Sequence, residues 1–168
     1  MLRLGIITAC ATLVFAGCAC PQIKRAAITT PECAVLKGTC SINSHKHWND
    51  TSIVLEAGHA YCLIVPGHQK WQDWGICSGP DGYCRRKLWL FEFWRRMPQA
   101  HWFALVGSVD KKKDARFVIG SGLAIYYPSR TGRLFCYAND VYGFYWNNSG
   151  TVTLSVYELP KLTTTPTN

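Results

Sequence analysis

A short stretch at residues 138–150, between two strand-like runs, concentrates oxygen-bearing side chains that could bind a metal ion. It carries one carboxylate, Asp140, and two adjacent carboxamides, Asn147 and Asn148, around Gly143. Calcium prefers about six to eight hard oxygen ligands from carboxylates, amide side chains and backbone carbonyls, and a turn exposes such carbonyls. A site with one carboxylate would carry little charge and would fill at extracellular calcium concentrations. The alternative is an ordinary polar turn, because Asn, Asp and Gly are common in loops.

Several short segments occur along the chain in an order that is typical of one lectin family. They are Gln69-Lys70-Trp71, Ala104-Leu105-Val106-Gly107, Phe117–Gly122, Asn139-Asp140-Val141 and Asn147-Asn148-Ser149-Gly150. Together they resemble the galactophilic calcium-dependent lectins of Pseudomonas, the LecA or PA-I type, over about residues 51–159. The last two segments are the more specific part of this resemblance.

The resemblance implies a calcium ion that the protein and a sugar bind together. Its implied ligands are the side chains of Asp140, Asn147 and Asn148 and the backbone carbonyls of Phe144 and Val65. In this family two neighbouring sugar hydroxyls bind the ion directly, so Asp140 and Asn147 would border the sugar, and Val141 would contact its ring. The implied activity is carbohydrate binding without catalysis. Because single shallow sugar sites bind weakly, we expect multivalency, for example in a homo-oligomer.

The loop that would select the sugar departs from the family's pattern. Residues 77–84 stand where the family has a His-Pro-x-Gln arrangement. Pro80 and Asp81 fit that arrangement and are candidate sugar contacts, but Gly79 and Gly82 replace its histidine and glutamine. The side chains that could supply replacement contacts are Trp74, Tyr83 and His101. Galactose-like glycans are therefore one option, and the sequence does not assign the sugar.

The region that follows this loop, residues 85–116, carries most of the positive charge. It holds nine of the 18 Lys and Arg residues and three acidic residues, a net charge of +6 out of a formal +8. Trp and Phe side chains lie between its basic flanks, which suits anionic lipid headgroups or acidic glycans. A second hypothesis is therefore a surface lipoprotein of the same fold that binds a protein, an anionic membrane or a glycan through residues 85–116. The alternative is a solvated hairpin or added strand with ordinary surface charge, and we expect no nucleic-acid partner.

The N-terminus predicts export. Residues 1–17 carry Arg3 before an apolar run that is too short for a membrane anchor, which is typical of a signal peptide. Phe15-Ala16-Gly17-Cys18 resembles the lipobox of bacterial lipoproteins, in which Cys18 would be lipidated and would anchor the protein to a membrane. Cleavage after Ala16 is the alternative. The expected location is the outer membrane or cell surface in the first case and the extracellular medium in the second.

Export favours disulfide bonds among the cysteines that follow residue 18. A C-x6-C spacing, which permits short loop-closing bridges, occurs twice, in Cys33 with Cys40 and in Cys77 with Cys84. Cys62 and Cys136 lie in strand-like runs, where they could pair or remain buried thiols. Zinc binding is a further alternative, although the sequence lacks a tight Cys-x-x-Cys pair.

The remaining pattern predicts an all-β fold. Charged residues make up 17% of the chain, which excludes a disordered polyelectrolyte or a coiled coil. Short strand-like runs separated by turn residues indicate a β-sandwich or barrel. With the lectin resemblance, we expect a jelly-roll β-sandwich, similar to a galactose-binding domain, over residues 51–160. Residues 18–50 are expected to form a tether or irregular lead-in, and residues 161–168 a flexible tail. Because nucleophile elbows, paired carboxylates and His-Glu-x-x-His motifs are missing from the sequence, we expect no enzyme, and an exported hydrolase is the remote alternative.

Overall fold

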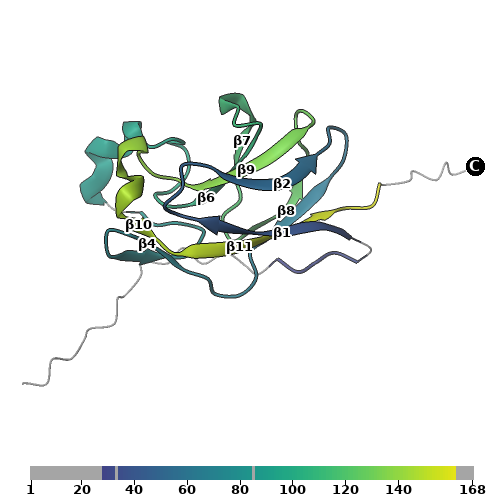
Figure 1. Ribbon diagram of the computed structural model, residues 1–168, viewed down its shortest axis with the longest axis horizontal. Coiled ribbons are helices and arrows are strands. Elements are labelled where there is room, and N and C mark those ends of the chain that lie inside the picture. The colour runs from purple at the N-terminus through teal and green to yellow at the C-terminus, as the bar shows by residue number, and fades with distance from the viewer. Residues whose placement is uncertain (1–27, 33, 85, 162–168) are drawn as a thin grey trace, which may run out of the picture.

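The structure is a computed structural model that describes residues 28–32, 34–84 and 86–161. Two four-stranded antiparallel sheets form a sandwich, and a third, three-stranded sheet lies near one end (Figure 1). This architecture confirms the predicted all-β sandwich. Among the described residues, no helix has the length and apolar character that a membrane span requires.

The strands fall into three hydrogen-bonded groups. The first sheet has the order β1 (Val35–Asn43), β11 (Thr151–Glu158), β3 (Tyr61–Ile64) and β8 (Gly122–Tyr126). The second has the order β2 (Asn49–Leu55), β9 (Gly132–Ala138), β6 (Leu105–Val109) and β7 (Arg116–Val118). The third has the order β10 (Asn148–Ser149), β4 (Trp71–Asp73) and β5 (Ile76–Ser78). Three 3-10 helices connect them: η1 (Arg86–Trp94), η2 (Lys113–Ala115) and η3 (Tyr142–Asn147).

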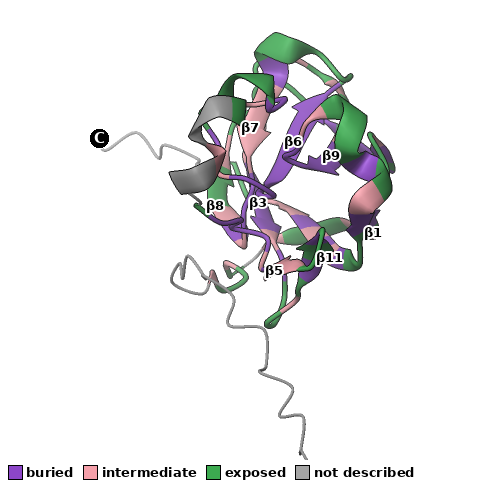
Figure 2. Cartoon of the chain, turned by 90° about the vertical axis from the view of Figure 1, so that its left-hand side faces the viewer, coloured by how far each residue is buried: buried purple, intermediate pink, exposed green. Residues whose placement is uncertain are grey.

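The apolar core lies between the two larger sheets. In β11, Val152, Leu154 and Val156 are fully buried, whereas the residues between them are more exposed, as the alternating sequence predicts. Strand β9 contributes Leu134 and Cys136 from the facing sheet. Figure 2 shows the buried residues gathered on inner strands such as β3, β6 and β9. Burial of these side chains, at about 25 cal/mol per Å² of apolar surface, is the main force that holds the sheets together.

The domain begins earlier than the sequence pattern predicted. Strand β1 lies inside residues 18–50, the expected tether or lead-in, and it pairs with β11 almost along its full length. As an edge strand it has one neighbour, so most of its side chains face solvent and Ile42 is the one that is classed as buried. Its apolar alternation is therefore too weak to identify it as a strand.

The region at residues 85–116, which we call the insertion, also differs from the expected hairpin or added strand, because residues 86–94 form the 3-10 helix η1. The predictions for the signal peptide at 1–17, for Cys18, for Cys33 and for residues 162–168 concern parts of the chain outside the described residues.

In the described part, Cys77 and Cys84 are free thiols, so the structure does not contain the expected bridge between them. Cys40 is likewise a free thiol.

Candidate functional site

A cavity of about 330 Å³ lies at the end of the sandwich where η1, η3 and the third sheet meet. Its lining combines two carboxylates, one carboxamide and a set of apolar and aromatic side chains. The lining residues are Asp73, Trp74, Ile76, Tyr83, Leu88, Phe91, Trp102, Asp140, Val141, Phe144 and Asn147. Such a mixture of a few polar groups in an apolar cavity is typical of a small-molecule site.

Asp140 lies two residues after the end of β9 and is almost completely buried. Its Oδ2 accepts a 2.9 Å hydrogen bond from Nδ2 of Asn148, and its Oδ1 accepts a 2.7 Å hydrogen bond from the backbone N–H of Val141. The six residues of η3 bring the chain back from Val141 to Asn147, so the two ends of the predicted loop meet. The structure therefore places Asp140, Asn147 and Asn148 together, as the calcium hypothesis requires.

The two carboxamides at the end of this loop each have a buried acceptor that lacks a partner. Oδ1 of Asn147 and Oδ1 of Asn148 receive no hydrogen bond from any described residue. Asn148 is only 4% exposed, so its oxygen has lost most of its contact with water. Because buried amide oxygens are normally satisfied, a pair of unsatisfied ones beside a carboxylate fits a cation that binds oxygen ligands.

Asp73 adds a second carboxylate that the sequence analysis did not include in the site. In β4 the side chains of Trp71 and Asp73 are buried and the one between them is exposed, so Asp73 points inward. Its Oδ2 accepts a 2.5 Å hydrogen bond from the hydroxyl of Tyr83, and Nδ2 of Asn147 lies 3.5 Å from its Oδ1. The sequence signal that could have identified Asp73 is its spacing: it lies two residues after Trp71 of the Gln-Lys-Trp segment, and residues i and i+2 of a strand share a face.

The electrostatic environment of the cavity favours a bound cation. Burial raises the pKa of Asp140 to about 6, and the negative charge of Asp73 adds to this increase. The hydrogen bonds from Asn148 and Val141 act in the opposite direction, because they stabilise the ionised form. A dication between the two carboxylates would remove both the desolvation cost and the mutual repulsion.

The other predicted site residues separate into two groups. Phe144, Val141, Trp74 and Tyr83 line the cavity. The remainder, Val65, Pro80, Asp81 and His101, are outside the described lining of the cavity.

Internal hydrogen bonds explain the positions of three residues in this second group. The backbone N–H of Val65 donates to the carbonyl of Ser121, and Val65 packs in the core. Asp81 is buried and accepts a hydrogen bond from the backbone N–H of Ser121. The carbonyl of Pro80 accepts one from Leu105. Pro80 and Asp81 thus connect the loop at 77–84 to the sandwich, and the structure does not place them where a sugar in this cavity would bind.

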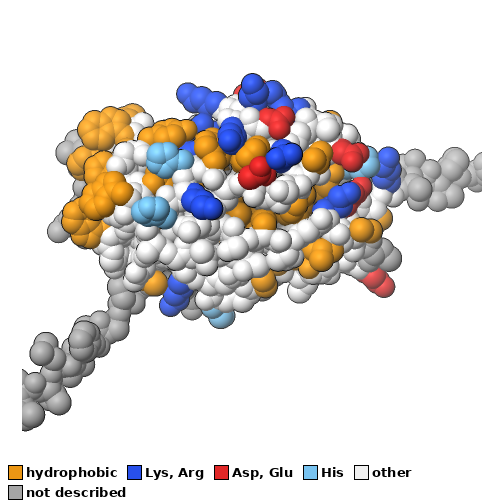
Figure 3. Space-filling model, viewed as in Figure 1, with side chains coloured by type: hydrophobic (Ala, Val, Ile, Leu, Met, Phe, Trp, Pro, Cys, Tyr) orange, Lys and Arg blue, Asp and Glu red, His pale blue; other side chains and the backbone are white. Residues whose placement is uncertain are grey.

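Exposed aromatic side chains surround the cavity. Trp74 is 69% exposed and Trp146 is 63% exposed, and their ring centres lie 5.8 Å apart in an edge-to-face arrangement. Phe91 and Phe144 continue this apolar surface on η1 and η3. In Figure 3 the hydrophobic side chains gather at this end of the molecule. We call Trp74, Phe91, Phe144 and Trp146 the aromatic rim.

The insertion presents fewer exposed positive charges at this end of the molecule than its sequence suggested. Arg95 and Arg96 are both buried. The guanidinium of Arg95 lies 4.9 Å from the ring centre of Trp102 and donates to the carbonyls of Pro98 and Ala100. These two arginines therefore stabilise the insertion from within and do not form part of a surface for anions.

Metal sites built from His, Cys, Asp and Glu alone are a different possibility. Within the described residues, no group of three or more such side chains could hold a metal ion. A cation at the cavity would depend on amide and carbonyl oxygens in addition to Asp73 and Asp140, and such a ligand set suits calcium better than zinc.

Comparisons with known proteins connect this chain to lectins through the fold. No family model matches the sequence, and no curated protein matches it. Among solved structures, the chain is similar to the N-terminal domain of EclA, which is described as a PllA-like lectin. The match has a TM-score of 0.56 at 15% sequence identity and covers 74% of this chain and 98% of that one. At this identity the comparison establishes a shared lectin-like fold, which supports the family resemblance at the level of the fold.

Proposed function

We propose that this protein is a non-enzymatic carbohydrate-binding protein whose calcium ion connects the protein to two sugar hydroxyls. The observation that carries the proposal is the pair of unsatisfied amide oxygens, on Asn147 and Asn148, beside the buried carboxylate of Asp140. The backbone carbonyl of Phe144 would add an oxygen from η3, and the resemblance assigns a further one to Val65. The lectin-like fold of the structural neighbour supports the same function.

Each group in the cavity has a separate part in this mechanism. Bound calcium would supply open coordination positions to a pair of hydroxyl oxygens. Asp140 provides negative charge, and its hydrogen bonds from Asn148 and Val141 hold the carboxylate in place. Val141 offers an apolar contact to the sugar ring, and the aromatic rim can pack against the apolar face of a sugar residue.

Calcium binding to the purified protein tests the proposal directly. Thermal unfolding is followed at pH 7.5, above the raised pKa of Asp140, with excess calcium or with EDTA. Calcium at about 100 times its Kd should stabilise the protein by about 2.7 kcal/mol. The Asp140→Ala variant should lose this stabilisation, whereas Asp114→Ala, an exposed aspartate that pairs with Arg130, should keep it. A wild-type protein that calcium does not stabilise would contradict the proposal.

A glycan array with and without calcium then identifies the sugar class. We expect the bound glycans to be retained in calcium and released in EDTA.

We also propose that the protein acts outside the cytoplasm, where calcium is abundant, either as a lipoprotein anchored through Cys18 or as a secreted protein. Labelling with a radioactive fatty acid, compared between wild type and Cys18→Ser, distinguishes these two forms.

The second candidate function is binding to a protein or an anionic membrane or glycan through residues 85–116. It is favoured by Phe93 and Trp94, which are 84% and 61% exposed on η1. Vesicles that contain anionic lipid should sediment with the protein in EDTA if this function is correct. Calcium-dependent glycan binding without such sedimentation would favour the lectin.

A further inference from the structure

We infer that Asp73 is a second carboxylate ligand of the cation site, so that the site carries two negative charges. This inference rests on the proposed function, because it concerns the same ion. It also changes the character of the site, since the loop at residues 138–150 supplies a single carboxylate. Asp73 comes from a different part of the chain and from outside the set of ligands that the lectin resemblance implies.

The pairing of β4 with β10 places Asp73 at the site. In this antiparallel pair Asp73 lies directly opposite Asn148, whose amide group bonds to Asp140. Asp73 and Asp140 line the same cavity. Asp73 therefore belongs to the cavity by backbone register as well as by side-chain position.

The unsatisfied amide oxygens are an independent indication that a ligand belongs between these groups. Oδ1 of Asn148 is buried and without a partner among the described residues, and so is Oδ1 of Asn147. The 3.5 Å contact between Asn147 Nδ2 and Asp73 Oδ1 is long for a hydrogen bond. A cation bound by Asp73, Asp140 and the two amide oxygens would satisfy both of those amide acceptors at once.

Tyr83 positions the Asp73 carboxylate. The Tyr83 side chain is almost completely buried, and its backbone N–H donates a 2.8 Å hydrogen bond to the carbonyl of Trp102. Its hydroxyl holds Oδ2 of Asp73, while Oδ1 of the same carboxylate lies on the side of Asn147. Fixing one oxygen in this way reduces the entropy that the carboxylate loses when the other oxygen binds a cation.

The charge of the site decides how tightly it binds calcium. Calcium affinity in oxygen sites increases with the number of charged ligands and with the rigidity of the site. Two carboxylates neutralise a dication completely, which matters because the side chains of Asp73 and Asp140 are both buried. The site should therefore bind calcium more tightly than one with Asp140 alone.

Isothermal titration calorimetry with calcium chloride on the metal-free full chain tests this inference. The Asp73→Asn variant should bind calcium at least about tenfold more weakly than wild type. Asp140→Asn should lose as much or more, and Asp114→Asn should bind like wild type. Wild-type affinity in Asp73→Asn would overturn the inference and leave the proposed function intact, whereas a wild-type protein that does not bind calcium would overturn both.

A second variant is needed if urea denaturation shows that the Asp73→Asn protein is not folded. Tyr83→Phe keeps both carboxylates but removes the hydroxyl that holds Asp73. We expect its calcium affinity to fall about threefold, with a larger entropic penalty in the calorimetry. Unchanged affinity and entropy in Tyr83→Phe would then count against Asp73 as a ligand.

Discussion

Nη1 of Arg96 donates a 2.8 Å hydrogen bond to the hydroxyl of Tyr145, which in turn donates to the carbonyl of Ala138. The guanidinium also lies 3.5 Å from the ring centre of Tyr137 and 4.2 Å from that of Trp48. Arg96 thus connects the end of the insertion with η3 and β9 directly behind the candidate site. A positive charge this deeply buried is tolerated because aromatic faces pack against the guanidinium and Nη1 donates to two oxygen acceptors, the Tyr145 hydroxyl and the carbonyl of His47.

We predict that Arg96→Ala destabilises the protein by about 3 kcal/mol, because cation–π contacts, hydrogen bonds and packing are lost together. Arg96→Lys keeps the charge and should lose less. Urea denaturation followed by tryptophan fluorescence measures both. A fully stable Arg96→Ala protein would show that the aromatic side chains hold this region without the cation.

Gly82 is a position where a side chain should not be tolerated. Its φ is +77°, and a Cβ atom there would lie 2.7 Å from the backbone N of Ala104 and closer still to the carbonyl of Trp102. We predict that Gly82→Ala costs at least about 3 kcal/mol or prevents folding. Gly58, with a φ of +83° and open space around it, provides a matched control that should cost about 1 kcal/mol. Equal stability losses in urea would mean that the loop at Gly82 can move away.

The aromatic rim should affect sugar binding but not calcium binding. Trp74 lines the cavity with its ring largely exposed, and its side chain offers no oxygen ligand. We predict that Trp74→Ala weakens glycan binding at least about fivefold, the loss of about 1 kcal/mol of ring contact. Calcium affinity by calorimetry should be unchanged. Tyr127→Ala, which removes an exposed aromatic ring outside the described cavity lining, should alter neither property.

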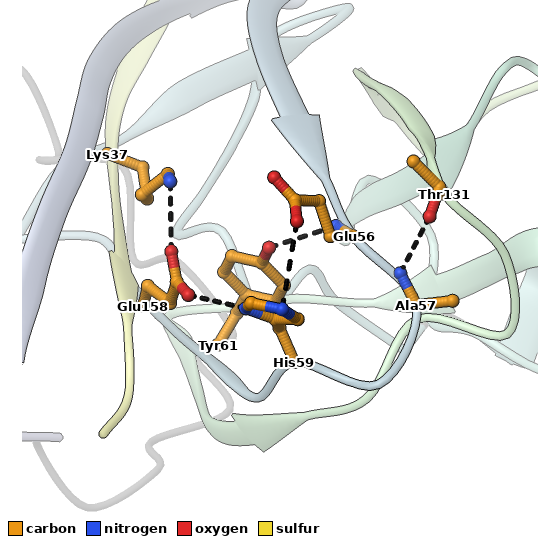
Figure 4. Close-up of polar contacts among 7 residues, drawn as sticks. All are labelled: Lys37, Glu56, Ala57, His59, Tyr61, Thr131 and Glu158. Carbon is orange, nitrogen blue, oxygen red and sulfur yellow. Dashed lines mark hydrogen bonds and ion pairs between the residues drawn. The ribbon is translucent and has the colours of Figure 1, made fainter. Parts of the chain in front are cut away.

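A polar network at the far end of β11 should make stability depend on acidic pH (Figure 4). Lys37 donates a 2.9 Å hydrogen bond to Oε2 of Glu158, and Nδ1 of His59 lies 2.5 Å from its Oε1. Hydrogen bonds from Lys37 and His59 lower the pKa of Glu158 below its ordinary value. The ionised form is therefore favoured in the folded protein, and this stabilisation is present above the ordinary pKa and is lost as the pH falls through the lowered one.

Thermal unfolding between about pH 3 and pH 7 tests this prediction. The melting temperature of Glu158→Gln should be lower than that of wild type near neutral pH, and the difference should shrink as the pH falls. Because the Glu158 side chain remains partly exposed, the effect should be small. A difference that stays constant over the whole range would assign the effect to packing instead of charge.

The sequence by itself determined the all-β class and the local part of the candidate site. The alternation of Val152, Leu154 and Val156 fixes which face of β11 is buried, because side chains in a strand point alternately to opposite faces. Asp140 and Asn148 lie eight residues apart, so one loop suffices to bring them together. Features of this kind depend on short-range geometry, which a sequence pattern records directly.

The tertiary structure alone decided which distant groups join that loop. Asp73 and Asn147 are 74 residues apart, and they meet because β4 pairs with β10. Asp81 fits the family's sugar loop in sequence, but its carboxylate is used to hold the backbone of Ser121. Strand pairing and the choice of hydrogen-bond partner depend on the free energy of the whole folded chain. A carboxylate therefore becomes a site residue or a structural one only when the sheets have assembled.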